Sequence, residues 1–337
     1  MMDGLQKLTE MIDLSPNEAE DAMKAMMSGT AAEVDVAAFL VALKMKGESP
    51  GEIAAMAKVM REYAVKIRPK VSGILVDMCG TGGDGSGTFN ISTAASFVVA
   101  AGGVPVAKHG NRSFTSKCGS ADVLEALGAR IDLRPERIES CIEEVGIGFM
   151  FAPAHHPAMK HVMPVRKQLG IRTVFNILGP LTNPAGAKAQ IMGVYDPSLT
   201  ERLAEVFRLL GLRRAFVVNG HPGLDEFSTI GPTKVSELNG GTVRNYVFGS
   251  ATLGFDKARL EDLKGGDAGD NAKIIRGVFS GEIKGAKRDI VVLNAAAGLA
   301  VGGVVDDLQS ACEIAGKVID SGGASDKLDE FIAYTRG

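Results

Sequence analysis

The sequence of 337 residues has no tryptophan, and aromatic residues make up only 5% of it. Platforms on which nucleic-acid bases could stack are therefore scarce. The formal net charge is −3, which gives no basic field to attract nucleic acid or an anionic membrane surface. The longest weakly polar run, over residues 94–107, contains glycines and a proline and is too short to span a bilayer. These absences predict neither a nucleic-acid partner nor a membrane partner.

Cysteine is also sparse. Cys79, Cys118, Cys141 and Cys312 form no C-x-x-C pair and have no regular spacing. This pattern favours free buried thiols in a reducing cytosol over a disulfide framework or a zinc site. The N-terminal stretch carries acidic residues and lacks an apolar signal core, so we expect a cytoplasmic protein. Its length and 45% hydrophobic content suit two or three globular domains.

Glycine, by contrast, is abundant and is concentrated after one apolar run. Residues 74–79 are typical of a buried strand, and five glycines follow within residues 80–87. Three polar residues then precede a predicted helix over 94–101: Asn90, Ser92 and Thr93. Glycine lets a backbone approach a ligand closely, and the first N–H groups of a helix attract anions. The stretch therefore predicts an anion site.

The kind of anion can be narrowed. Gly80 to Gly85 fits the pattern G-x-G-x-x-G, but a dinucleotide site also needs an acidic residue about 20 positions on. No Asp or Glu occurs between Gly85 and Ala121, whereas Lys108 and Arg112 do. The Gly-Lys-Ser/Thr of a P-loop is absent as well. We therefore expect a ligand with several phosphates; the alternative is a tight glycine turn with no ligand.

Three segments make a family resemblance specific. Gly80-Thr-Gly-Gly-Asp84, Asn90-Ile-Ser-Thr93 and Lys108-His-Gly-Asn-Arg112 resemble the phosphoribosyl-pyrophosphate motifs of the anthranilate phosphoribosyltransferase family, and residues 165–184 form a second dense match. The resemblance covers nearly the whole chain. It implies a glycosyltransferase of tryptophan biosynthesis. The implied reaction transfers the phosphoribosyl group of 5-phosphoribosyl 1-pyrophosphate (PRPP) to the amine of anthranilate, giving N-(5-phosphoribosyl)anthranilate and pyrophosphate.

The resemblance also implies the substrate contacts. The PRPP contacts would be Gly80, Gly83, Asp84, Thr88, Asn90, Ile91, Ser92, Thr93, Lys108, Asn111, Arg112, Ser116 and Ser120. The anthranilate contacts would be Gly80, Asn111, His156 and Arg166. A guanidinium suits a planar carboxylate, although Arg166 on chemistry alone could equally form a surface ion pair. His155 departs from the family pattern, and its role is open. Phe114 and Cys118 also depart from the family in the basic loop.

Two adjacent acids, Asp225 and Glu226, follow a predicted strand over 215–219. At the carboxyl end of a strand, opposite a polyphosphate loop, they suit Mg²⁺ held by carboxylates and substrate oxygens. The resemblance adds Ser92 as a third metal ligand. An Asp-Glu pair alone is usually a solvated turn. No residue of this sequence is assigned as a catalytic acid or base.

The predicted fold is α/β, with a small N-terminal all-helical domain and a larger α/β domain built on a mainly parallel sheet. The helical domain covers residues 1–70, and about 157–185 return to it; residues 71–156 and 186–337 form the α/β domain. Further strands are expected over 104–107, 149–153, 190–195, 243–248 and 289–293. Ser120 is expected to cap a helix over 121–127. Surplus apolar surface on residues 1–68 predicts a homodimer through the helical domain, as the family also implies.

Two rival functions stay open. A pyrimidine nucleoside phosphorylase has a similar architecture and glycine loop, but it needs a single phosphate and would leave the Asp-Glu pair without a task. A transferase-like protein that binds nucleic acid would need a basic stripe, and the overall charge is acidic.

Overall fold

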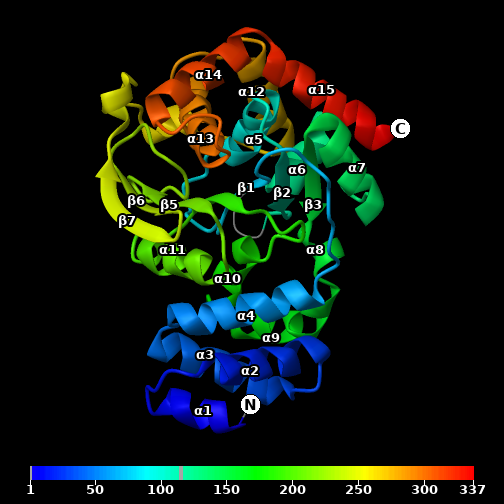
Figure 1. Cartoon of the computed structure of the whole chain (residues 1–337), viewed down its shortest axis with the longest axis vertical. Helices are drawn as coiled ribbons and strands as arrows, with labels where there is room; N and C mark the ends of the chain where they lie inside the picture. The colour runs from blue at the N-terminus through cyan, green and yellow to red at the C-terminus, as the bar shows by residue number, and fades with distance from the viewer. Residues whose placement is uncertain (1, 114–116) are drawn as a thin grey trace.

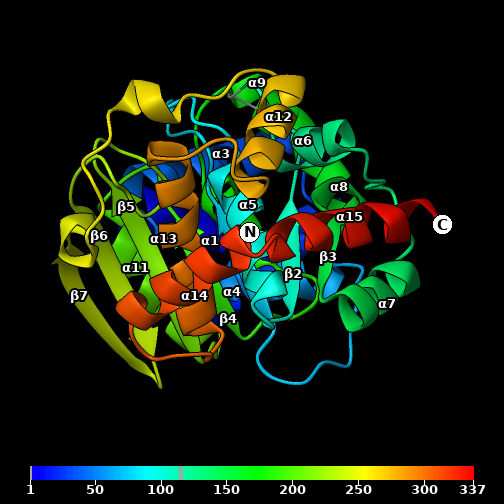
Figure 2. The same ribbon diagram turned by 90° about the horizontal axis from the view of Figure 1, so that it is seen from above.

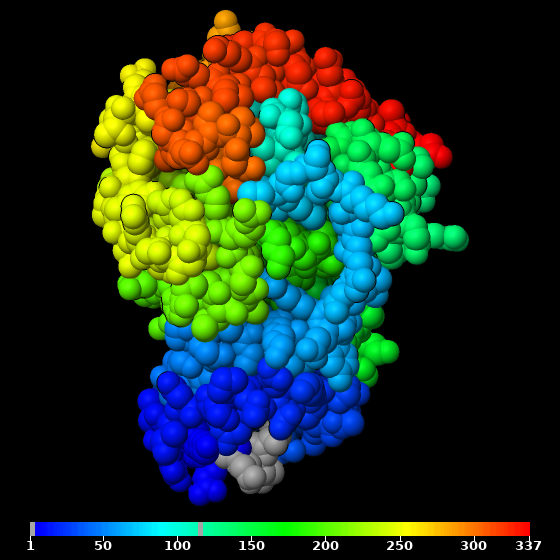
Figure 3. Space-filling view, viewed as in Figure 1, coloured from blue at the N-terminus to red at the C-terminus, as the bar shows by residue number. Residues whose placement is uncertain are grey.

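The computed structural model describes residues 2–113 and 117–337. Phe114 and Ser116 lie outside the described residues. The first four helices form a bundle at one end of the molecule, and the α/β part lies above it (Figure 1). Figure 3 shows this bundle as a lobe at the blue end of the surface. Its helices are α1 (Met2–Thr9), α2 (Pro16–Ser28), α3 (Glu33–Lys46) and α4 (Pro50–Tyr63).

Two helices of the bundle begin in the same way. Ser15 and Ser49 each stand before a proline, and each accepts a hydrogen bond from the N–H of a glutamate three residues on. Those glutamates, Glu18 and Glu52, bond back to the serine N–H and complete capping boxes. Glu52 is fully buried and also accepts bonds from the Leu14 N–H and the Lys46 ammonium, both at 2.9 Å. The cap of α4 is therefore part of the bundle core.

The central sheet has seven strands in the order β3-β2-β1-β4-β5-β6-β7. The pairs from β3 to β5 are parallel, and β6 and β7 are antiparallel additions at one edge. This confirms the predicted mainly parallel sheet. The strands are β1 (Val76–Gly80), β2 (Val106–Gly110), β3 (Ile147–Phe151), β4 (Ala189–Gly193), β5 (Arg214–Gly220), β6 (Thr233–Asn239) and β7 (Thr242–Phe248).

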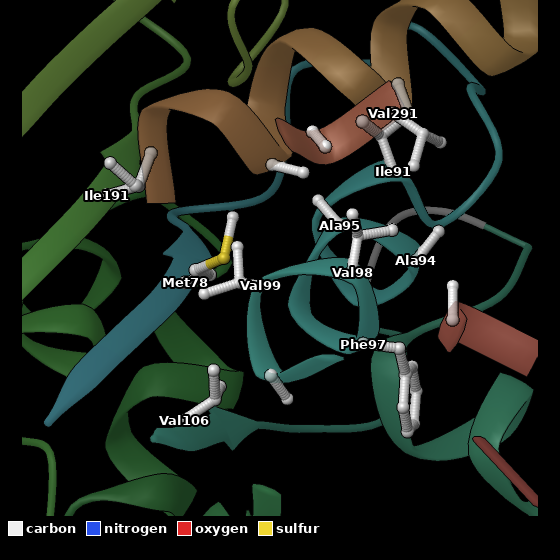
Figure 4. Packing of buried hydrophobic residues seen from close by; sticks show 14 of the residues in the cluster. Met78, Ile91, Ala94, Ala95, Phe97, Val98, Val99, Val106, Ile191 and Val291 are labelled. Carbon is white, nitrogen blue, oxygen red and sulfur yellow. The ribbon is translucent and has the colours of Figure 1, made fainter. Parts of the chain in front are cut away.

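One face of the sheet is covered by C-terminal helices together with α5 (Ile91–Ala101), as Figure 2 shows from above. In Figure 4, Met78 of β1 lies against Val99 of α5. The neighbouring α13 packs so closely on α5 that a Cβ at Gly298 would lie 2.5 Å from Val99. The other helices of the α/β part are α6 (Ser120–Leu127), α7 (Pro135–Val145), α8 (Ala152–His155), α11 (Leu199–Leu209), α12 (Ala268–Phe279), α13 (Ala286–Val301), α14 (Leu308–Asp320) and α15 (Gly323–Arg336).

The opposite face of β4 and β5 shares a hydrophobic cluster with α11 and with the bundle. The segment after α8 joins the same cluster through Val162, Val165, Val174 and Phe175. It contains α9 (Met163–Leu169), α10 (Phe175–Leu178) and the 3-10 turns at Pro157–His161 and Gly179–Leu181; two further turns lie at Ser250–Leu253 and Leu260–Leu263. The domain boundaries themselves stay a prediction.

Three local predictions need correction. Residues 289–293 are not a strand but part of α13, whose buried residues face the core on almost all sides and so imitate the run of a buried strand. Ser120 is the first residue of α6 rather than its cap, which is Gly119. Helix α5 begins at Ile91, so the polar pair Ser92 and Thr93 lies in its first turn. Within the described residues, no helix combines the length and the apolarity needed to cross a membrane.

Candidate active site

The candidate site lies where the strand order changes direction. β1 has β2 on one side and β4 on the other, and all three are parallel. At such a point, the chain segments that follow the neighbouring strands run to opposite sides of the sheet, and a crevice opens between them at the carboxyl ends of the strands. Open α/β sheets bind their ligands in this crevice. The glycine loop leaves β1 at this point, and the acidic turn follows β5 beside it.

The glycine loop, residues 80–87, is held at several points of its backbone. The Thr81 N–H donates to the Gly193 carbonyl at 2.8 Å, and the Gly82 N–H donates to Asp225 Oδ2 at 2.9 Å. Further along, Lys264 Nζ donates to the Ser86 carbonyl at 2.6 Å. Gly82, Gly83 and Gly85 have φ values of +64°, +76° and +68°, which favour glycine. The conformation of the loop is therefore fixed by these hydrogen bonds and by its glycine residues.

The acidic turn reaches the loop because two glycines leave it space. A Cβ at Gly80 would lie 2.2 Å from Asp225 Oδ2, and one at Gly193 would lie 1.5 Å from the Asp225 carbonyl oxygen. Glu226 Oε1 accepts a bond from the Ser92 N–H at 3.0 Å. Of the predicted metal ligands, Glu226 therefore lies at the backbone of Ser92 in the first turn of α5, and Asp225 lies at the Gly82 amide.

A residue that sequence reasoning missed holds this turn. Asn294 is fully buried in α13, and its side chain forms two hydrogen bonds with the backbone of Phe227. Its Oδ1 accepts from the Phe227 N–H at 2.9 Å, and its Nδ2 donates to the Phe227 carbonyl at 3.0 Å. The Asn-Ala-Ala-Ala run at residues 294–297 resembles the family, but nothing in the run indicates which backbone it contacts.

The electrostatics of the acidic turn fit a divalent cation. Burial of the carboxyl groups, followed by the charge of Asp84, raises the pKa of Asp225 to about 7. Burial and the Asp225 charge raise the pKa of Glu226 to about 8, although both residues keep some exposed surface. Among the described residues, the buried Asp84 Oδ2 has no hydrogen-bond donor. Oxygen-only donors with excess negative charge suit Mg²⁺.

This donor set is incomplete on its own. Across residues 2–113 and 117–337, no three His, Cys, Asp or Glu side chains form a ready-made metal cage. Mg²⁺ commonly binds through one or two carboxylates and completes its shell with substrate phosphates and water. Two carboxylates and the Ser92 hydroxyl therefore match a metal that arrives with a phosphorylated substrate.

Lys108 is buried beside these acids. Its Nζ donates to the Met78 carbonyl at 2.5 Å and to Ser92 Oγ at 3.4 Å. Burial lowers the pKa of Lys108, and the nearby Cys79, Asp77 and Glu226 charges oppose that shift. The ammonium thus lies against the first turn of α5 rather than in solvent.

In the loop that follows β2, the predicted PRPP contact Arg112 has acidic partners within the protein. Arg112 is exposed and pairs with Asp122 at 3.0 Å and Glu125 at 2.5 Å, both on α6, which raises its pKa. A phosphate would have to compete with these acids for Arg112. Asn111 is exposed, and its carbonyl accepts a bond from the Ser120 hydroxyl at 3.3 Å.

Other predicted PRPP contacts have structural partners of their own. Asn90 is bonded through its Nδ2 to the Cys118 carbonyl at 3.2 Å, and Asn271 donates to Asn90 Oδ1 at 3.0 Å. Thr88 forms an isolated bridge with Lys264. The side chains of Ile91 and Thr93 are buried, so an exposed contact there would come from the backbone of α5.

The histidines divide into two roles. His155 Nδ1 lies 2.7 Å from the Val65 carbonyl, so this side chain connects α8 to the segment that follows α4. His155, which differs from the family pattern, therefore has a structural role. The rings of His156 and His109 lie 5.1 Å apart. Burial, aided by the neighbouring histidine His155, lowers the pKa of His156 to about 4, and burial holds the pKa of His109 well below its usual value. Over residues 2–113 and 117–337, the buried Nε2 of each ring has no hydrogen-bond partner.

Arg166 lies on α9 and is partly buried. Its guanidinium carbon is 5.3 Å from the centre of the Phe175 ring. Burial lowers its pKa, and no carboxylate of the described residues opposes that shift. The ion-pair alternative is therefore wrong for the described residues, and the guanidinium keeps its capacity for an external carboxylate. Neither Arg166 nor His156 shares a hydrogen bond with the glycine loop in the part of the chain described.

A glycine loop is bonded to an acidic turn at the carboxyl ends of a mainly parallel sheet, and a helical bundle packs beside it. Arg166 on α9 has no carboxylate partner among the described residues. This arrangement defines a transferase of phosphorylated sugars. Comparison with known proteins agrees. Residues 72–325 match the α/β domain of the glycosyl transferase family, and residues 2–64 match the helical bundle domain of a glycosyl transferase family.

Full-length relatives narrow the class. The anthranilate phosphoribosyltransferase of Methanocorpusculum labreanum is 56% identical over 99% of this chain and 97% of its own. The crystal structure of the Thermus thermophilus enzyme is 46% identical, covers 99% and 100% of the two chains, and superposes with a TM-score of 0.94. The Saccharomyces cerevisiae enzyme in complex with PRPP and Mg is 28% identical, covers 99% and 97%, and gives a TM-score of 0.90. The chain belongs to the anthranilate phosphoribosyltransferase family.

Proposed function

We propose that this chain transfers the phosphoribosyl group of PRPP to the amine of anthranilate and releases pyrophosphate, as a step of tryptophan biosynthesis. The observation that carries the proposal is the contact of the Asp225–Glu226 pair with the glycine loop and the start of α5. It brings a divalent-cation donor set against a row of anion-binding amides. Within residues 2–113 and 117–337, Cys79, Cys141 and Cys312 form no disulfide, which fits a reducing compartment, and we place the enzyme in the cytoplasm.

Mg²⁺ would be held by Asp225, Glu226 and Ser92, and when bound it would neutralise charge on the pyrophosphate group. The backbone amides of the glycine loop and Lys108 would bind the same group and stabilise it as it leaves. Asn111 and Arg166 would orient anthranilate, so that its amine faces the anomeric carbon. Since a neutral aromatic amine is already nucleophilic, no residue needs to act as a strong base.

The phosphorylase rival is disfavoured by the same contact. A nucleoside phosphorylase binds one inorganic phosphate, and that leaves no role for the carboxylates that meet at the loop. Incubation of the protein with PRPP, Mg²⁺ and anthranilate should consume the fluorescence of anthranilate, whereas thymidine with phosphate should give no free thymine. Release of thymine without turnover of anthranilate would overturn the proposal.

We also propose a homodimer through the helical bundle. Val34 and Met45 on α3 are 72% and 76% exposed, and Met163 on α9 is 42% exposed. Between α3 and α9 lies a groove of about 510 Å³, lined by Glu33, Val34, Ala37, Val165, Gln168 and Leu169. Apolar surface of this extent favours association with a second copy.

Light scattering at micromolar protein tests the dimer. The wild type should have the mass of two chains, and Val34→Glu with Met45→Glu should give a monomer. Val247→Glu is a matched control, because Val247 is equally exposed, at 72%, on the distant edge strand β7. A wild type that is monomeric under these conditions would contradict the dimer.

A further inference from the structure

Arg172 binds the glycine loop from a segment that packs with the helical bundle. It lies between α9 and α10, in the segment whose side chains Val165, Val174 and Phe175 pack with the helical bundle. Its Nη2 donates a hydrogen bond to the carbonyl of Gly83 at 2.5 Å. The tip of the loop is therefore held by a residue from the segment that also carries Arg166.

The guanidinium of Arg172 is fixed by a stacking partner. Its central carbon lies 3.9 Å from the centre of the Tyr195 ring, just beyond the end of β4. Stacking on a ring face favours one orientation of the planar fork. The Tyr195 N–H in turn donates to Thr81 Oγ1 at 3.2 Å, within the same loop. Tyr195 thus connects the base of the loop to the arginine that holds its tip.

The loop is fitted closely to this arginine. A Cβ at Gly83 would lie 3.2 Å from Arg172 Nη2, and the φ of Gly83 is +76°. Among the described residues, the loop backbone also bonds to Gly193, Asp225, Lys264 and Gly265, which belong to the α/β part. Arg172 supplies the contact that crosses from the helical side.

We propose that Arg172 is a positioning residue, which holds the glycine loop in its PRPP-binding conformation from the segment that carries the anthranilate-side arginine. The inference rests on the proposed function, because it takes the loop to be the PRPP site. A glycine-rich segment has much conformational entropy to lose when it binds a ligand. The hydrogen bond from Arg172 to Gly83 restricts the loop in the ligand-free protein, so less conformational entropy is lost when PRPP binds. Arg172 thereby raises the affinity for PRPP without contacting it.

Steady-state kinetics of Arg172→Ala test the proposal. Since Arg172 is largely exposed, we expect a rise of roughly three- to thirty-fold in the KM for PRPP. The KM for anthranilate should stay within about twofold, because Arg166 is untouched. Arg172→Lys should fall between wild type and Arg172→Ala, since an ammonium can meet the carbonyl but cannot stack as a plane. Lys167→Ala, at an exposed position on α9 in the same segment, should behave as wild type.

Amide hydrogen exchange on the ligand-free protein separates this proposal from the proposed function. Exchange over residues 81–87 should be faster in Arg172→Ala than in wild type and unchanged in Lys167→Ala, whether or not PRPP is the substrate. Unchanged exchange in Arg172→Ala would overturn the positioning role. Equal losses for both substrates with a lowered Tm would also overturn it, because that pattern indicates a structural role alone. An inactive wild type would reject the proposed function while leaving the exchange result valid.

Discussion

Replacing Arg166 by alanine should mainly impair the use of anthranilate. The guanidinium is partly buried, lies 5.3 Å from the Phe175 ring centre, and has no carboxylate partner among the described residues. A charge-assisted bond is worth about 1.5–3 kcal/mol, and partial exposure reduces this to about 1–2 kcal/mol. That corresponds to a rise of roughly five- to thirty-fold in the KM for anthranilate. The KM for PRPP should barely change, since its contacts lie on the glycine loop and α5.

The assay is the initial rate of loss of anthranilate fluorescence, with each substrate varied in turn. Arg166→Lys should recover only part of the loss, because lysine lacks the planar fork that matches a carboxylate. Lys167→Ala is the matched control, since Lys167 is the exposed neighbour on α9. Aniline, which has no carboxylate, should be a poor substrate of the wild type and no worse with the variant. A variant with normal use of anthranilate but impaired use of PRPP would refute the reasoning and make Arg166 a phosphate ligand.

Three further outcomes are expected. Gly193→Ala would place a Cβ 1.5 Å from the Asp225 carbonyl oxygen, so Mg²⁺-dependent activity should be lost. Gly51→Ala is the control: no neighbouring group lies within 4 Å of its new Cβ, and the activity should be unchanged in the same assay. Glu52→Ala removes the acceptor of the Leu14 and Ser49 N–H groups and leaves Asp13 as the acidic partner of Lys46. It should lower the free energy of unfolding by about 1–3 kcal/mol in urea titrations. The pKa values of Asp225 and Glu226 rise on folding to about 7 and 8, so the folded protein loses stability as these carboxyl groups ionise. Without metal, the Tm should therefore fall as pH rises from about 5 to about 8, and added Mg²⁺ should raise the Tm most at the alkaline end. A Tm that rises with pH in the absence of metal would contradict this.

Much of the site could be predicted because it lies at strand ends. The Gly80–Asp84 run and the Asp225–Glu226 pair each follow an apolar run, and parallel strands bring their carboxyl ends to one edge. The strand order β1-β4-β5, which the sequence does not specify, then brings the two segments together across one intervening strand. Family resemblance supplies the remaining contacts, because residue types such as Asn111 and His156 have many roles.

The residues that hold the site could not be predicted in this way. Asn294 and Arg172 are distant in sequence from the backbone that they bind, and neither lies in a pattern that specifies its partner. Arg112 is expected to face phosphate, but two acids of the next helix pair with it. Residues 289–293 resemble a strand because a helix buried on all sides loses the amphipathic period that would identify it. Strand β6 escapes prediction because its alternation is short and contains charged residues.

The central claim is that the carboxylate pair binds Mg²⁺ together with PRPP against the glycine loop. Isothermal titration of PRPP into the wild type, with and without Mg²⁺, tests it most directly, alongside the double variant Asp225→Ala with Glu226→Ala. The wild type should bind PRPP much more tightly with Mg²⁺, and the double variant should lose that dependence while it keeps a cooperative thermal transition. The same Mg²⁺-dependent gain in affinity in both proteins would contradict the claim.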